Sequence, residues 1–179
     1  MRTLLLLCAI ILFGACEKDP KTNPPQSTAP NSSKSKKADG KVFILKDING
    51  TKVDIKIEGN QIESSIQKPL VLLFFYTDWC PSCKAQKPEL KRLYQTFSHD
   101  LFILGVPLEP TQTKAPFFQS LQIDQNNRLA QAIYPTLGAG ANMPIPLLVL
   151  LKNGRYYRHY VGAVPYEILQ SDIKSAKGE

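Results

Sequence analysis

The sequence predicts an α/β fold, a sandwich built around a central mixed sheet with helices on both faces. Two observations support this. Residues 70–76 form an unbroken apolar run, as expected for a central parallel strand buried on both faces, and a helical pattern begins soon afterwards at Pro81. Residues 147–151 and 155–161 flank Asn153-Gly154, a strong signal for an antiparallel hairpin.

The N-terminal part of the folded region is predicted to begin with a β-hairpin. Residues 42–46 and 52–57 alternate apolar and polar around Asn49-Gly50, a pair that favours a type I′ turn. Residues 61–66 are predicted to form a short helix with Asn60 as its N-cap.

A long helix is predicted over residues 81–97. Pro81 suits the first helical position, where its missing N–H costs nothing, so Cys80 should stand at the helix N-terminus. Pro88 lies inside the helix and should kink it. The helix has one apolar stripe, made of Leu90, Leu93, Tyr94 and Phe97.

The remaining elements complete the predicted sheet and its helical cover. Residues 101–106 form the next strand, and two short helices, 115–123 and 126–133, are expected as an insert after it. Residues 134–144 are rich in Gly, Ala and Pro and form a loop expected beside the active site. Residues 166–175 form the final helix.

Cys80 and Cys83 are separated by two residues at a strand-to-helix junction, a spacing typical of a redox pair. Unpaired N–H groups and the positive end of the helix dipole favour a thiolate at Cys80, which makes it the attacking sulfur. Cys83 lies one turn further on, at the spacing that closes a disulfide. Half of a zinc site is the alternative. It lacks ligands, because only His99 and His159 remain and neither is spaced as a metal pair, so we expect no metal.

In these residues the chain resembles the thioredoxin-like proteins, in particular their membrane-tethered extracytoplasmic branch of TlpA- and ResA-like lipoproteins. The resemblance covers roughly residues 42–174 and includes Ile145-Pro146 with the hairpin after it, then Val161-Gly162-Ala163. It implies a thioredoxin-like sandwich in which the helical insert precedes a cis-proline at Pro146. Pro135 is rejected as that proline because no strand-like run follows it.

The resemblance also implies site residues around the cysteine pair. Ile145 would present its backbone to a bound peptide beside Cys80, and Trp79 would offer an apolar docking face. Gly162 would leave room for a partner backbone near Pro146, and a simple bulge is the alternative explanation for a glycine there. No cofactor is expected.

Two positions depart from the family pattern. Phe74 stands where thioredoxin has a buried aspartate, and Gln86 stands where the tethered reductases often carry a glutamate. The general base for the buried thiol therefore has no obvious candidate, and Lys84, Glu89 or water remain open. Residues 77–80 also supply the Thr-x-x-Cys part of a thiol peroxidase motif. The proline of that motif is replaced by Leu73, so peroxidase activity is a weak alternative.

The N-terminal residues read as an export signal followed by a tether. Residues 1–15 combine Arg2, an apolar stretch too short to span a bilayer and a Gly-Ala ending, and Cys16 follows as in a bacterial lipobox. A cleaved signal without lipid at Cys16 is the simpler alternative. Residues 16–40, with four prolines and few apolar side chains, should form a disordered linker spanning about 25–30 Å, which leaves residues 41–179 as one domain.

Composition limits the function further. The formal net charge is +7, or +6 once Arg2 leaves with the signal, and no arginine-rich run accompanies it, so nucleic-acid binding is not expected. Of the four cysteines, Cys8 lies in the signal and Cys16 at the anchor, which leaves no structural disulfide. An exported chain with only one such pair is expected to exchange disulfides.

The sequence thus predicts a monomeric extracytoplasmic thiol–disulfide oxidoreductase, held to the membrane by a lipid and acting on protein thiols and disulfides. The Pro81-Ser82 pair lacks the histidine common in strongly oxidising relatives, and Ile145 before Pro146 resembles reducing thioredoxins, so we expect a reductase. Similar tethered proteins receive electrons from a membrane thiol transporter, and some reduce apocytochrome c. The alternatives are a disulfide oxidase or isomerase and a non-catalytic thioredoxin-like binding module.

Overall fold

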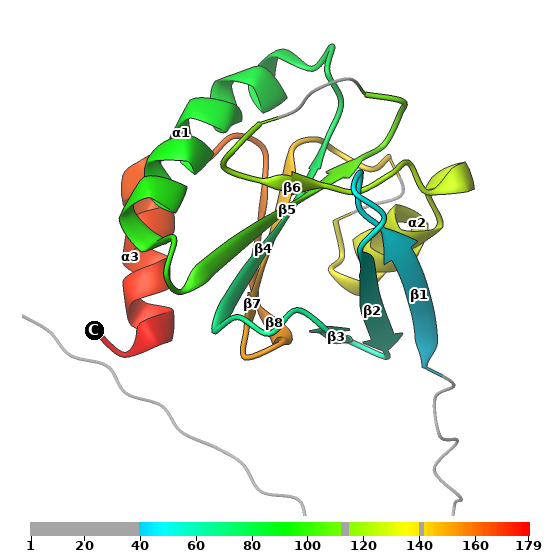
Figure 1. Cartoon of the computed structure of the whole chain (residues 1–179), viewed down its shortest axis with the longest axis horizontal. Coiled ribbons are helices and arrows are strands. Elements are labelled where there is room, and N and C mark those ends of the chain that lie inside the picture. Colours follow the sequence, from blue (N-terminus) through cyan, green and yellow to red (C-terminus); the bar gives the residue numbers. More distant parts are fainter. Residues whose placement is uncertain (1–39, 112–114, 140–141) are drawn as a thin grey trace, which may run out of the picture. The chain divides into compact units, whose positions relative to one another are not determined.

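The computed structural model describes residues 40–111, 115–139 and 142–179 (Figure 1). The predictions for the export signal, for Cys16 and for nearly all of the linker fall on residues 1–39, outside the described residues. Within the described residues, no helix combines the length and apolar composition needed to cross a membrane.

One mixed sheet organises the described residues, with strand order β1-β2-β3-β8-β7-β4-β5-β6. Its strands are β1 (Lys41–Lys46), β2 (Lys52–Glu58), β3 (Gln61–Ser64), β4 (Leu70–Tyr76), β5 (Leu101–Pro107), β6 (Gln119–Ser120), β7 (Leu147–Lys152) and β8 (Arg155–Val161). The helices are α1 (Pro81–Phe97), the 3₁₀ turn η1 (Gln125–Asn127), α2 (Arg128–Thr136) and α3 (Tyr166–Lys177). β4 runs parallel to β5 and antiparallel to β7, which confirms the mixed α/β sandwich.

β4 divides the core into two layers because successive side chains of a strand point to opposite faces. Phe74 and its even-numbered neighbours pack with the buried faces of α1 and α3. Phe75 and its odd-numbered neighbours pack with α2 and the β1–β2 hairpin. Figure 1 shows α1 and α3 together on one side of the sheet and α2 on the other. All seven residues of β4 are buried, so the strand delivers its C-terminal end to a rigid position.

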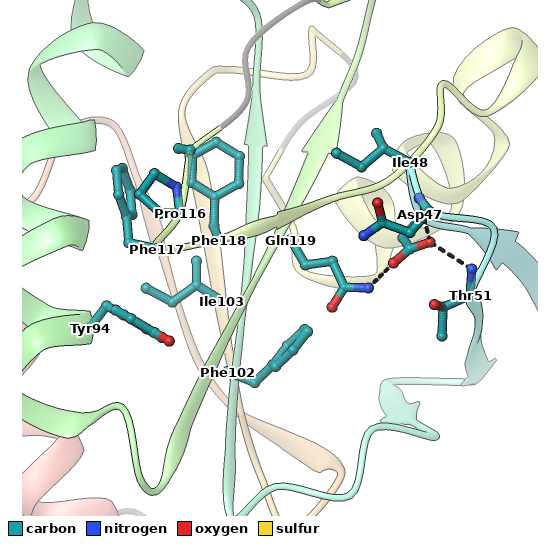
Figure 2. Close-up of a pocket in the computed structure, with 12 residues that line it drawn as sticks. Asp47, Ile48, Thr51, Tyr94, Phe102, Ile103, Pro116, Phe117, Phe118 and Gln119 are labelled. Atoms are coloured by element: carbon teal, nitrogen blue, oxygen red, sulfur yellow. Dashed lines mark hydrogen bonds between the residues drawn. The ribbon is translucent and has the colours of Figure 1, made fainter.

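The β1–β2 connection differs from the predicted type I′ turn. Lys46 and Lys52 form the last pair of the hairpin, so five residues make the loop. The buried carboxylate of Asp47 organises it by accepting the N–H groups of Asn49 at 2.9 Å and Thr51 at 2.6 Å. Gln119 donates its side-chain amide to the same carboxylate (Figure 2). The hydrogen bonds of Asp47 therefore fix the conformation of this loop, and the type I′ turn predicted from Asn49-Gly50 is wrong.

The same loop brings the two ends of the sheet together. Ile48 donates its N–H to the Ser120 carbonyl at 3.0 Å, and Gln122 donates to the Lys46 carbonyl at 2.8 Å. These bonds join β1 to the segment that contains β6, although the two strands stand at opposite ends of the strand order.

Two predicted helices are wrong. Residues 61–64 form strand β3, which pairs with β2 and buries Ile62 completely. In the segment predicted as helix 115–123, a turn at residues 115–118 leads into β6, and Phe118 packs edge-on against the rings of Phe74 and Tyr76. Both segments are too short to hold a helix against the pairing that the neighbouring strand offers.

The second helix of the predicted insert is confirmed as α2, which continues to Thr136 and takes in residues expected to be loop. The predicted bounds of α1 match, and α3 ends two residues later than expected. The β7–β8 turn is also confirmed, with Asn153 at φ 50° and Gly154 at φ 78°. A type I′ turn requires positive φ at both central residues.

Candidate active site

Cys80 and Cys83 form a disulfide at the N-terminus of α1, with their Cα atoms 5.2 Å apart. Cys80 is the N-cap residue, and its Sγ accepts the N–H of Cys83 at 3.1 Å. Pro81 occupies the start of the helix, as the sequence predicts. The helix N-terminus therefore directs an N–H donor at the Cys80 sulfur, which favours negative charge there once the disulfide is reduced.

The two sulfurs differ in access. Cys83 is fully buried, whereas Cys80 keeps a small exposed fraction of 4%. Trp79, directly before Cys80, is 65% exposed. A large apolar side chain is therefore accessible next to Cys80, and the docking role of Trp79 stays a prediction.

A second backbone segment, distant in sequence, reaches the disulfide. The Ile145–Pro146 peptide bond is cis, as the resemblance implied, and the carbonyl oxygen of Ile145 lies 3.9 Å from Cys80 Sγ. Pro135 lies within α2, so its rejection as the cis-proline is confirmed. Tyr134 donates its hydroxyl to the Pro144 carbonyl at 3.0 Å, and burial raises the pKa of this tyrosine, so it remains a donor.

Gly162 lies next to the cis-proline segment and donates its N–H to the Pro146 carbonyl at 2.8 Å. Its φ of +88° is in the left-handed region, and among the described residues other than its two chain neighbours no atom lies within 4 Å of where a Cβ would stand. The neighbouring Val161 is 51% exposed. The space beside Gly162 is thus open, and its use by a partner backbone stays a prediction.

A polar cluster fixes the connection between β4 and α1. The Asp78 carboxylate accepts Lys87 Nζ at 3.2 Å and the hydroxyl of Thr111, and Lys87 Nζ lies 5.1 Å from the centre of the Tyr76 ring. Burial raises the pKa of Tyr76, against the hydrogen bond with Ser120. Sequence reasoning did not assign roles to Lys87 or Thr111, because no local spacing relates Asp78 to a residue 33 positions away.

Thr77, the threonine of the weak peroxidase motif, is buried, and its hydroxyl has no hydrogen-bond partner among the described residues.

The positions that depart from the family pattern are both buried. Phe74 is fully buried and stacks on Tyr76 with ring centres 4.8 Å apart, so an aromatic ring fills the place of the aspartate. Gln86 is also fully buried, and its side-chain amide bonds to the backbone of Val164.

Lys84 and Glu89, the two side chains considered as general bases for the Cys83 thiol, lie in different environments. Lys84 is exposed. Glu89 accepts the N–H of Tyr166 at 3.1 Å and pairs with Arg92 at 3.3 Å, so its carboxylate binds the N-terminus of α3.

A separate hollow lies between α1, β5 and the β1–β2 loop (Figure 2). Tyr94, Phe102 and Phe117 supply apolar walls, and Asp47 and Gln119 lie at its polar end. None of the residues proposed for the site from the sequence lines it. The hollow is therefore distinct from the disulfide site.

A cysteine pair at a helix N-terminus, with a cis-proline segment beside the outer sulfur, defines a thiol–disulfide oxidoreductase of the thioredoxin type. The thioredoxin family model matches residues 53–175, and the chain therefore belongs to the thioredoxin family. It is a thiol–disulfide oxidoreductase with the pair Cys80 and Cys83.

Individual relatives are distant. The chain is 27% identical to a thioredoxin of Bacillus subtilis over 116 residues, which cover 65% of this chain and 90% of the relative. Thioredoxin 1 of Chlorobaculum tepidum is 25% identical over 108 residues, covering 60% of this chain and 85% of the relative. A crystal structure from Chlorobium tepidum, described as that of a thiol:disulfide interchange protein, DsbE, superimposes with a TM-score of 0.55 at 20% identity, over 78% of this chain and 94% of that one.

Proposed function

We propose that this protein reduces disulfides in other proteins on the extracytoplasmic side of a membrane, to which a lipid on Cys16 holds it. The observation that carries the chemistry is the placement of Cys80 as the N-cap of α1, where its sulfur receives an N–H and keeps some exposure while Cys83 has none. One sulfur is thus available to a partner, and the other is held one turn away to complete the exchange.

The reaction follows from this asymmetry. In the dithiol form, the Cys80 thiolate attacks one sulfur of the partner's disulfide, that disulfide breaks, and its other sulfur leaves as a thiolate that takes up a proton. Cys83 then loses its proton and attacks Cys80 Sγ in the mixed disulfide. The second partner sulfur leaves as a thiolate, two electrons have passed to the partner, and the Cys80–Cys83 disulfide remains.

The reducing direction is supported by the residues around the pair. Pro81 and Ser82 place no histidine between the cysteines, so no cationic ring stabilises the thiolate further and makes the disulfide form more oxidising. Each turnover leaves the protein oxidised, and a membrane thiol transporter would restore the dithiol. Apocytochrome c cysteines are the substrates we propose, on the likeness to tethered reductases.

The location is supported by the first 40 residues. Arg2, the apolar stretch after it and Cys16 form an export signal with a lipid attachment site. The residues from Glu17 to Gly40 are polar and proline-rich, and they would carry the domain clear of the lipid headgroups.

Measuring the reduction potential of the Cys80–Cys83 couple tests the direction. Purified protein is equilibrated with glutathione buffers, and the dithiol fraction is counted by alkylation and mass spectrometry. We expect a value close to that of thioredoxin, about −270 mV, and far from the strong oxidants at about −120 mV. A potential above about −160 mV would contradict a reductase and support the oxidase or isomerase alternative.

A further inference from the structure

Gln86 is a buried polar residue whose side chain forms hydrogen bonds with the backbone of Val164. It lies on α1 one turn after Cys83 and is fully buried. Val164 donates its backbone N–H to Gln86 Oε1 at 2.6 Å, and Gln86 Nε2 donates to the Val164 carbonyl at 3.2 Å. One side chain thus satisfies both backbone groups of a residue 78 positions away, as a neighbouring strand would.

The contact continues from Val164 to the disulfide through backbone groups. Val164 lies in the short connection between β8 and α3, two residues after Gly162. Gly162 donates its N–H to the Pro146 carbonyl at 2.8 Å, and the Ile145 carbonyl lies 3.9 Å from Cys80 Sγ. The connection is therefore held on one side by α1, which carries both cysteines, and on the other by the cis-proline segment.

We propose that Gln86 is a positioning residue for thiol–disulfide exchange. Its amide sets the place of residues 162–164 against α1, and through them the place of the backbone at Ile145 and Pro146 that a partner protein meets when it reaches Cys80. The residue touches no reacting atom. It affects how a protein partner is held, because the backbone at Ile145 and Pro146 shifts if the Val164 contact is lost.

The amide is suited to this role in a way that a carboxylate is not. A carboxylate can accept the Val164 N–H, but it cannot donate to the Val164 carbonyl, and it carries charge into a buried site. A protonated carboxyl can make both bonds, so a glutamate would hold the connection only at low pH. Glutamine holds it at every pH without adding a charge next to Cys83.

The decisive experiment compares Gln86→Leu, Gln86→Glu and the wild type as purified proteins. The readouts are KM and kcat for insulin disulfides with dithiothreitol as the reductant, and the rate of a single turnover with the small aromatic disulfide DTNB, measured on reduced protein from which dithiothreitol has been removed. We expect Gln86→Leu to raise the insulin KM by about tenfold, because the backbone at Ile145 and Pro146 is displaced. The DTNB rate should change by less than about twofold, because Cys80 stays at the N-terminus of α1.

Leu129→Ala is the matched control for lost stability. Leu129 is buried in α2, in the core layer on the other side of the sheet, away from the Gln86 contact. It should lower the unfolding midpoint and leave the insulin KM unchanged. The role assigned to Gln86 would be overturned if the insulin KM of Gln86→Leu stayed within about twofold of wild type, or if insulin and DTNB rates fell by the same factor.

Gln86→Glu keeps the test decisive if Gln86→Leu does not fold. Its insulin KM, divided by that of wild type at the same pH, should be near one at about pH 5 and rise by about tenfold at pH 8. Cys83, Glu89 and Arg92 on α1 and Glu167 on α3 are the titratable and charged groups around this region, and they are common to both proteins, so the ratio removes their titration. A ratio independent of pH would overturn the proposal. The expected result does not depend on whether the protein works as a reductase in the cell.

Discussion

At the scale of single residues, the two sulfurs of the site have different surroundings. Cys80 is the N-cap of α1 and lies beside the exposed Trp79, whereas Cys83 is fully buried within the helix. A thiolate is stabilised at a helix N-terminus, and a buried thiol without such a donor keeps its proton. From this difference we predict that Cys80 attacks a partner's disulfide and that Cys83 then releases the partner.

The first prediction follows from that assignment. Cys83→Ser should accumulate mixed disulfides with protein partners through Cys80, because no second sulfur is left to release them. Cys80→Ser should accumulate few. The adducts are counted on non-reducing gels after acid quenching.

The alkylation rate of the reduced wild type provides the control at neutral pH. Iodoacetamide should modify Cys80 well before Cys83, as read by peptide mass spectrometry. Faster modification of Cys83 would mean that the roles are exchanged.

At the scale of elements, the packing of β5 against the segment before β6 depends on Gly105. A Cβ at this position would lie 2.8 Å from two ring carbons of Phe118 and 3.2 Å from the ring of Tyr76. Phe118 in turn packs edge-on against Phe74 and Tyr76. The glycine is therefore needed for close approach and not for an unusual backbone conformation.

Gly105→Ala tests this packing. Replacing glycine by alanine at an ordinary backbone conformation stabilises a protein by about 0.4–1 kcal/mol, whereas overpacking a core costs about 1–3 kcal/mol. We expect the cost of the clash to exceed the gain from alanine, so that the free energy of unfolding, measured in urea, falls by about 1–2 kcal/mol. Phe118→Leu should lose stability alone but relieve the clash in the double variant. Unfolding free energies that simply add would show that the two side chains do not meet.

At the scale of the whole molecule, the folded domain and the first 39 residues have separate roles in the proposed function. The domain holds the redox pair within its own core, with Cys80 and Cys83 in the same buried cluster as the faces of α1 and α3. Its chemistry should therefore not depend on the anchor. The first residues would determine only where that chemistry takes place.

Cys16→Ala tests this separation in a bacterial host. A lipidated cysteine carries more than one acyl chain, and two or more chains give stable membrane attachment where one is marginal. The variant should move from the membrane fraction to the soluble extracytoplasmic fraction, with unchanged insulin reduction in extracts. Wild-type protein found unlipidated in the soluble fraction would contradict the anchor and leave only the export signal.

The sequence by itself determined the elements that local chemistry dictates. The apolar run of β4 predicts a buried strand, Pro81 after Cys80 starts α1, and Asn153-Gly154 closes the β7–β8 turn. The redox pair follows from a local spacing as well, and in each of these cases the residues that decide the structure are neighbours in the chain. The cis-proline at Pro146 was expected only from the resemblance to the thioredoxin-like proteins.

Tertiary structure alone decided the rest, because the deciding partner is distant in sequence. β3 and β6 are short segments that became strands where a neighbouring strand offered its edge, and the buried Asp47 replaced the expected turn while bonding Gln119 across the sheet. Around the disulfide, Asp78 contacts Thr111 and Gln86 contacts Val164, pairs that only the folded structure brings together. Short segments and buried polar side chains have no conformation of their own to impose, so they adopt the one that satisfies their hydrogen bonds in the folded protein.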